Sequence, residues 1–98
     1  MNEGQTRYAV HPQASHRAVG GEIFIVTSDR AFHRLSVPSA VDTFLAIAQG
    51  NARRADLEAQ VVARYQVSAQ QAHVDVGLFL QSLLDKQVIV VAEDAPCG

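Results

Sequence analysis

The stretch SAQQAHVDVGLFLQSLLDKQVI, residues 68–89, decides how this chain folds. Its apolar residues recur at the spacing of one helical face, namely Ala72, Val76, Phe79, Leu80, Leu83 and Leu84. Ser68 is followed three residues later by Gln71, which is typical of a capping box, so the helix is predicted to start at Ala69. The β-branched run over residues 88–91 then predicts an extended segment.

Three short strands are predicted upstream, before any helix. In the segment SHRAVGGEIFIVT, the pair Gly20-Gly21 indicates the tight turn of a β-hairpin. A second turn is predicted over residues 28–30, and it leads into a third strand over residues 31–35. Nothing later in the sequence pairs clearly with this third strand, so we expect its outer edge to be open.

Two shorter helices are predicted between the strands and the long helix. The first contains Pro38 in its first turn, buries Val41 and Phe44, and ends at Gly50. The second has an apolar stripe of Leu57, Val61 and Tyr65, with Arg53, Arg54, Glu58 and Arg64 expected on its solvent-facing sides. The order β-β-β-α-α-α predicts an α+β fold of the winged helix-turn-helix type. We expect residues 1–13 to be a flexible N-terminal arm, residues 14–92 the folded domain and residues 93–98 a flexible tail.

Composition narrows the function. A chain of 98 residues suits one domain, and a formal net charge of −2 disfavours nucleic acid as a partner. Cys97 is the single cysteine, which excludes an internal disulfide, and no apolar run suggests secretion or a membrane span, so a cytoplasmic protein is predicted. The histidines lack metal-ligand spacing, and no nucleophile has an adjacent base. We therefore expect no metal, no cofactor and no enzymatic activity.

Four segments match the pattern of a known family. They are HRAVGGEIFIV, then FHRLSVPSAVDTFLAIAQG, then Leu57 to Tyr65, and last Asp75-Val76, Phe79-Leu80, Leu83 and Val88-Ile89. From about His16 to Ile89 the chain thus resembles the PqqD family, also called the RiPP recognition element, a winged-helix-like peptide-binding domain. It departs from the family at Arg53, where Thr is common, and at Gln87, where Gly is common.

The resemblance implies a specific function. Such domains bind the leader segment of a ribosomally made precursor peptide, which adds as a strand to the third strand and packs beside the third helix. The bound peptide is presented to a modifying enzyme, often a radical SAM protein or a leader peptidase, and the domain itself does no chemistry. In physical terms this is β-augmentation, in which backbone hydrogen bonds supply affinity and side-chain pockets supply selection. We therefore expect a free-standing peptide chaperone of natural product biosynthesis.

Candidate peptide-binding residues follow from the open strand and from a second apolar edge on the long helix. They are Ala31, Phe32, His33, Arg34 and Leu35 on the strand, and Val74, Asp75, Leu78, Gln81 and Ser82 on the helix. Each has a simpler interpretation. Phe32 could be covered within the fold, Val74 and Leu78 could be ordinary surface residues or a self-association seam, and Asp75 could only face solvent.

Two other functions stay open from the sequence. A winged-helix nucleic-acid binder would use basic residues, and these cluster at Arg53, Arg54 and Arg64 on the short second helix rather than on the long one. A dimerisation module would pair the open strand edge or the segment over residues 88–91 with a second copy. A homodimer would not exclude peptide binding.

Overall fold

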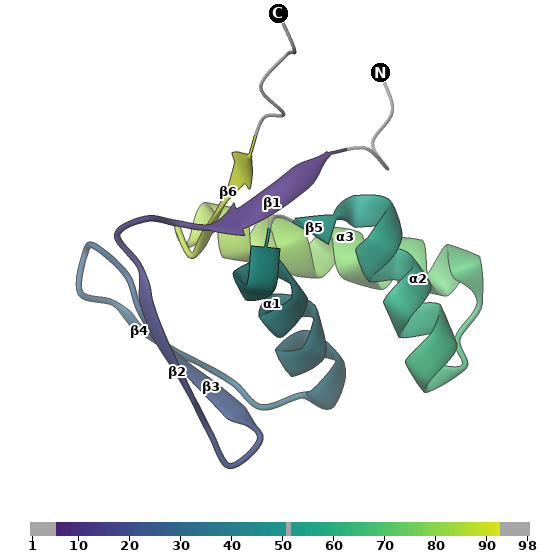
Figure 1. Ribbon diagram of the computed structural model, residues 1–98, viewed down its shortest axis with the longest axis horizontal. Coiled ribbons are helices and arrows are strands. Elements are labelled where there is room, and N and C mark those ends of the chain that lie inside the picture. The colour runs from purple at the N-terminus through teal and green to yellow at the C-terminus, as the bar shows by residue number, and fades with distance from the viewer. Residues whose placement is uncertain (1–5, 51, 93–98) are drawn as a thin grey trace, which may run out of the picture.

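The computed structural model describes residues 6–50 and 52–92, and it has an α+β fold in which two small sheets pack around three helices (Figure 1). The elements are β1 (Arg7–Val10), β2 (Ser15–Val19), β3 (Glu22–Val26), β4 (Phe32–Leu35), α1 (Pro38–Gly50), β5 (Ala52–Arg53), α2 (Arg54–Tyr65), α3 (Ala69–Asp85) and β6 (Ile89–Ala92). The predicted meander and three helices are present in the predicted order, and β1, β5 and β6 add a second sheet to them.

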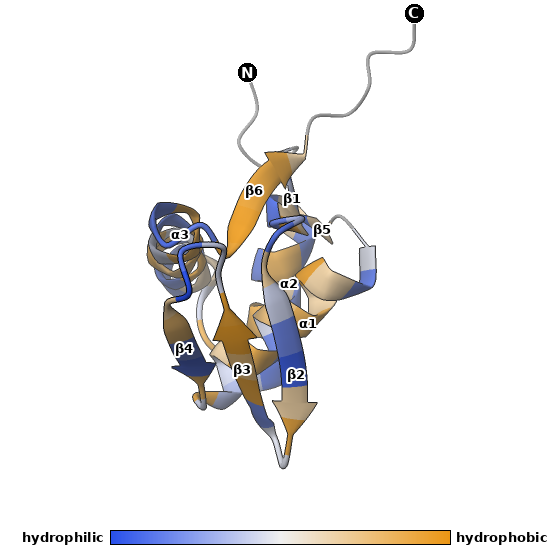
Figure 2. Ribbon diagram, turned by 90° about the vertical axis from the view of Figure 1, so that its left-hand side faces the viewer, coloured by the Kyte–Doolittle hydropathy of each residue, from blue (hydrophilic) through white to orange (hydrophobic). Residues whose placement is uncertain are grey.

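The first sheet is the predicted antiparallel meander, with strand order β2-β3-β4. Gly20 and Gly21 have φ angles of 59° and 82°, the left-handed conformation that the hairpin turn requires. Ile23 and Ile25 of β3 are fully buried, and Figure 2 shows β3 as a largely hydrophobic strand between its two neighbours. The buried isoleucines place one face of this sheet on the core.

The second sheet, of order β5-β1-β6, corrects the expectation of a flexible arm over residues 1–13. Residues Arg7 to Val10 form β1, which pairs along its whole length with β6, and Tyr8 is only 6% exposed. The strand forms because β6, some 80 positions later in the chain, supplies its hydrogen-bond partners, and local composition does not reveal such a partner. Residues 1–5 and the tail expected over residues 93–98 lie outside the described residues.

Both ends of α3 are fixed by capping. As predicted, the Ser68 hydroxyl accepts from the Gln71 N–H at 3.0 Å and the helix starts at Ala69. The Gln71 side chain donates to Asp75 at 2.8 Å, so it does not complete the capping box. At the C-terminal end the Val88 N–H donates to the Leu83 carbonyl and the Gln87 N–H to the Leu84 carbonyl, which is a Schellman motif. Gln87 therefore occupies a left-handed position, with φ of 62°.

The prediction that Arg54 and Glu58 face solvent is wrong. Their side chains are 15% and 22% exposed, and Arg54 Nε lies 2.9 Å from Glu58 Oε2. Arg54 also donates from Nη2 to the carbonyl of His73 on α3, at 3.2 Å. The guanidinium lies over Gly77, where an added Cβ would come within 2.5 Å of Nη2. Because Gly77 has no side chain, the Arg54 guanidinium fits against α3 and is mostly, though not fully, buried.

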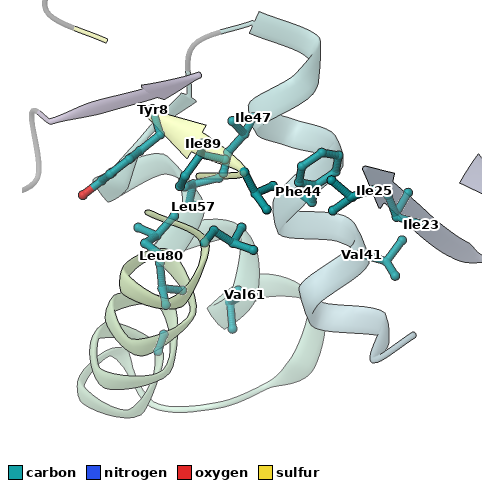
Figure 3. Close-up of a cluster of buried hydrophobic side chains, with 14 residues drawn as sticks. Tyr8, Ile23, Ile25, Val41, Phe44, Ile47, Leu57, Val61, Leu80 and Ile89 are labelled. Carbon is teal, nitrogen blue, oxygen red and sulfur yellow. The ribbon is translucent and has the colours of Figure 1, made fainter. Parts of the chain in front are cut away.

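A single hydrophobic core joins the elements. Figure 3 shows Ile25 of β3, Phe44 of α1, Leu57 of α2, Leu80 of α3 and Ile89 of β6 pointing into one cluster, and each is at most 1% exposed. Burial of this kind contributes roughly 1.5–3 kcal/mol for each large apolar side chain. Within this core α3 packs against α2 and β6, which leaves its remaining faces available for other contacts.

Candidate functional site

Strand β4 is the open edge of the first sheet. Among the described strands it pairs only with β3, so the main-chain groups on its other side have no strand partner. The turn before it is held by Asp29, whose carboxylate accepts from the Ala31 N–H at 3.2 Å and from the Thr27 hydroxyl. These bonds, with the Thr27 bond the larger cause, hold the pKa of Asp29 below its ordinary value. The edge is thus fixed in position where it begins.

The side chains of β4 alternate between the two faces of the sheet. Register pairs His33 with buried Ile25 and Leu35 with buried Ile23, so these two residues face the core side. Phe32 and Arg34 face outward. Phe32 is 65% exposed, and its ring centroid lies 6.0 Å from that of Phe24. Arg34 Nε lies 3.9 Å from Glu22 Oε1. Phe32 is therefore not covered within the described part of the fold.

Helix α3 divides its predicted site residues between two sides. At about 100° per residue, Asp75, Phe79 and Ser82 fall on one flank of the buried stripe. Val74 and Leu78 each fall about 160° from Val76, and they are 47% and 68% exposed. Gln81 lies on the outward side too, and its side chain donates to Asp85 at 2.9 Å. We name the first set, Asp75, Phe79 and Ser82, the groove flank.

A pocket of about 300 Å³ lies where the groove flank meets the start of α1. Its wall is mostly apolar and consists of Val37, Ser39, Ala40, Thr43, Val61, Tyr65, Val67, Asp75, Val76 and Phe79. Val37 lies two positions after the end of β4 and is 59% exposed. Figure 2 shows β4 on the α3 side of its sheet and β2 on the far side. An extended chain paired with β4 and running past Leu35 would therefore meet this pocket within one or two residues.

The α2 side of the pocket is held by Asp42 of α1. The Tyr65 hydroxyl donates to Asp42 Oδ2 at 2.5 Å, and Arg64 Nη1 lies 3.3 Å from the same oxygen. Gln60 donates to the Asp42 carbonyl at 3.3 Å. The hydrogen bond to Asp42 is the main reason that the pKa of Tyr65 is raised above its ordinary value of 10.0. The Tyr65 ring is therefore tied across from α2 to α1.

The structure thus brings some of the predicted residues together and separates others. Asp75 lines the pocket, Ser82 shares its flank, and Ala31 to Leu35 form or lead into the open edge. Val74 and Gln81 face away from the groove flank. Of the ten residues that line the pocket, Asp75 alone was among the candidates, and the nine others include Val37, Tyr65 and Phe79. Phe79 was assigned to the buried stripe, although its position at the border of that stripe is the signal that could have identified it.

The basic residues predicted on the second helix, of which Arg53 ends β5 and Arg54 and Arg64 belong to α2, do not form a free patch. Arg53 Nε lies 3.4 Å from Asp56 Oδ2. Arg54 forms an ion pair with Glu58, and Arg64 forms one with Asp42. Charges that are already paired with carboxylates neutralise fewer phosphates, which weakens the nucleic-acid interpretation. Within residues 6–50 and 52–92, no cluster of three or more His, Cys, Asp or Glu side chains could hold a metal ion. No helix in that part of the chain is long and apolar enough to cross a membrane.

The outer face of the first sheet carries a second apolar surface. Val26 pairs with Phe32 across the two strands, and both are exposed, at 41% for Val26. Phe24 lies on the same face against Phe32. Arg17 and Arg34 flank Phe24 in the register of the sheet. This outer sheet face lies on the opposite side of β4 from the core, so it is available even when the edge of β4 is occupied.

Comparison with known proteins identifies one similar structure. No protein-family model matches the chain, and no curated protein matches it in sequence. The fold is similar to that of a solved structure described as "TbiB1 in Complex with the TbiA(beta) Leader Peptide", with a TM-score of 0.79 and 15% sequence identity. The similarity covers 88% of this chain and 99% of the other. The chain therefore shares the fold of a protein that was solved with a leader peptide.

Proposed function

We propose that this chain is a chaperone that binds the leader segment of a ribosomally made precursor peptide and presents it to a modifying enzyme. The observation that carries the proposal is the open edge of β4 ending beside an apolar pocket. A leader strand would pair with the β4 main chain and place one apolar side chain in the pocket. The similarity in fold to a protein solved with a leader peptide supports the same function.

The proposal gives the chain a binding role and no chemistry of its own. Edge pairing supplies affinity that depends little on sequence, because the bonds involve the main chain. Selection would come from the pocket, which Asp75 and Phe79 line, and from Ser82 on the same flank of α3. The leader would be one partner and the modifying enzyme, such as a radical SAM protein or a leader peptidase, the other.

The binding step is tested with synthetic leader peptides that correspond to short reading frames encoded beside this gene. Isotope-labelled protein is titrated with each peptide, and chemical shift changes are expected over residues 31–37 and on the groove flank. N-methylation of alternate peptide residues should weaken binding roughly tenfold where the lost N–H pointed at β4, and little at the positions between. Shift changes along β2 alone would contradict edge pairing at β4.

Presentation to the enzyme requires a second surface, and the outer sheet face is suited to it. Val26 lies one strand in from the edge, so it cannot supply main-chain bonds to a peptide paired with β4. Val26→Asp should leave leader affinity within about twofold and weaken association of the loaded chain with the enzyme by at least tenfold. Gln70→Asp, at an exposed position near the start of α3, is the control for added charge. A variant that loses leader affinity instead would contradict this assignment.

A further inference from the structure

Tyr65 lines the pocket but is not part of the buried core. Tyr65 is the last residue of α2, because Gln66 adopts a left-handed conformation with φ of 55° and turns the chain toward Val67. A terminal helical residue has neighbours on one side only, and Tyr65 is 36% exposed. Its ring nevertheless forms part of the pocket wall, and the Asp42 carboxylate holds its hydroxyl. The position of this wall thus depends on one side-chain hydrogen bond.

We propose that the Tyr65–Asp42 hydrogen bond sets the width of the pocket and thereby selects the apolar anchor side chain of the bound peptide. The inference deepens the proposed function and rests on it. Tyr65 is the specificity-determining residue, and Asp42 is a positioning residue that acts through it. When the bond is present, the ring stands between α1 and α2 and limits the space above Val61, Val76 and Phe79. When the hydrogen bond is absent, the Tyr65 ring turns toward solvent. The pocket then accepts larger anchor side chains, but it contacts any given anchor less closely.

The neighbouring charges are arranged to keep this bond in place. Arg64 Nη1 lies 3.3 Å from the same Asp42 oxygen that accepts from Tyr65, so two side chains of α2 hold the Asp42 carboxylate from the same side. Thr43, which also lines the pocket, does not compete for Asp42, because its hydroxyl donates to the Ser39 carbonyl at 2.8 Å. The hydroxyls of Tyr65 and Thr43 are therefore both bonded within the protein, and the pocket offers a mostly apolar wall to the ligand.

Tyr65→Phe tests the inference, because it removes the hydroxyl and keeps the ring. Leader affinity is measured for the natural peptide and for versions in which its anchor residue is Ala, Leu, Phe or naphthylalanine. The natural anchor is expected to bind the variant roughly three- to tenfold more weakly, while the naphthylalanine peptide binds it as well as or better than wild type. Asp42→Asn keeps an acceptor for the hydroxyl and should have a smaller effect than Asp42→Ala. Asp85→Asn, on the outward side of α3, is the matched control and should change no affinity.

The results separate this inference from the proposed function. An equal loss of affinity for every anchor, or no change for any, would overturn the role of Tyr65 in selection and leave leader binding intact. If no leader binds the wild-type chain, the proposed function fails, and toluene then serves as the probe of the pocket. Toluene should shift the amide signals of Val76 and Phe79 in the wild type and do so at least threefold more weakly in Tyr65→Phe. Identical toluene titrations in the two proteins would overturn the inference as well.

Discussion

The close packing of Arg54 on Gly77 predicts that Gly77→Ala destabilises the chain when Arg54 is present and stabilises it when Arg54 is replaced by Ala. A Gly in the interior of a helix costs about 0.5–1 kcal/mol relative to Ala, so Gly77→Ala should by propensity alone stabilise α3. The added Cβ, however, would come within 2.5 Å of Arg54 Nη2, so the guanidinium must move. Its bonds to Glu58 and to the His73 carbonyl would then be weakened or lost.

The magnitude follows from these opposing terms. Losing a partly buried, charge-assisted hydrogen bond costs about 1.5–3 kcal/mol, and this exceeds the gain in helix propensity. Gly77→Ala should therefore destabilise the wild type by about 0.5–2 kcal/mol. In an Arg54→Ala background the clash is absent, and the same substitution should stabilise the chain by about 0.5–1 kcal/mol. The coupling energy between the two positions is expected to be about 1–3 kcal/mol.

Urea denaturation of the four proteins of the cycle, followed by circular dichroism, measures this coupling. Comparable m-values across the set would show that the differences are differences in stability. Leader affinity serves as a second readout. It should be nearly unchanged, because Gly77 and His73 lie on the opposite side of the buried stripe of α3 from Asp75, Phe79 and Ser82. If Gly77→Ala has the same effect in both backgrounds within about 0.5 kcal/mol, the packing argument is refuted.

Three further predictions concern the local structure around the site. Gln87→Gly should stabilise the chain by about 0.5–1 kcal/mol in thermal unfolding, because φ of 62° at that position favours glycine, and a loss of stability would contradict the strain assigned to it. Ser68→Ala should cost about 1 kcal/mol in urea denaturation through loss of the cap of α3, whereas Ser68→Asp, which keeps an acceptor, should cost much less. Asp29 has a lowered pKa, so its bonds stabilise the folded state above its ordinary pKa of 3.8 and are lost as pH falls through the lower folded value. Protection of the Ala31 amide from hydrogen exchange should therefore decrease on acidification below that pH, and an unchanged profile would refute the role of the carboxylate.

The edge and the pocket differ in how far the sequence predicts them. An open third strand followed from the turn residues and from the absence of a later partner, and the structure places β4 at the edge of its sheet. The pocket could not be predicted in the same way, because its wall combines Val37 before α1, Tyr65 at the end of α2 and Phe79 within α3. Val74 and Leu78 were predicted to contact the peptide because they are apolar residues outside the buried stripe of the helix. Phe79 was not predicted, because it lies at the border of that stripe.

Features that depend on neighbours within about four positions could be predicted from the amino-acid sequence. These include the capped start of α3 at Ser68, its buried stripe, and the hairpin turn at Gly20-Gly21. Tertiary structure decided what requires residues far apart in the chain to meet. Arg54 is mostly buried because Gly77, on another helix, has no side chain, and β1 exists because β6 supplies its hydrogen bonds. The geometry of local turns and caps is carried by each segment itself, whereas packing and strand pairing depend on distances that only the folded chain sets.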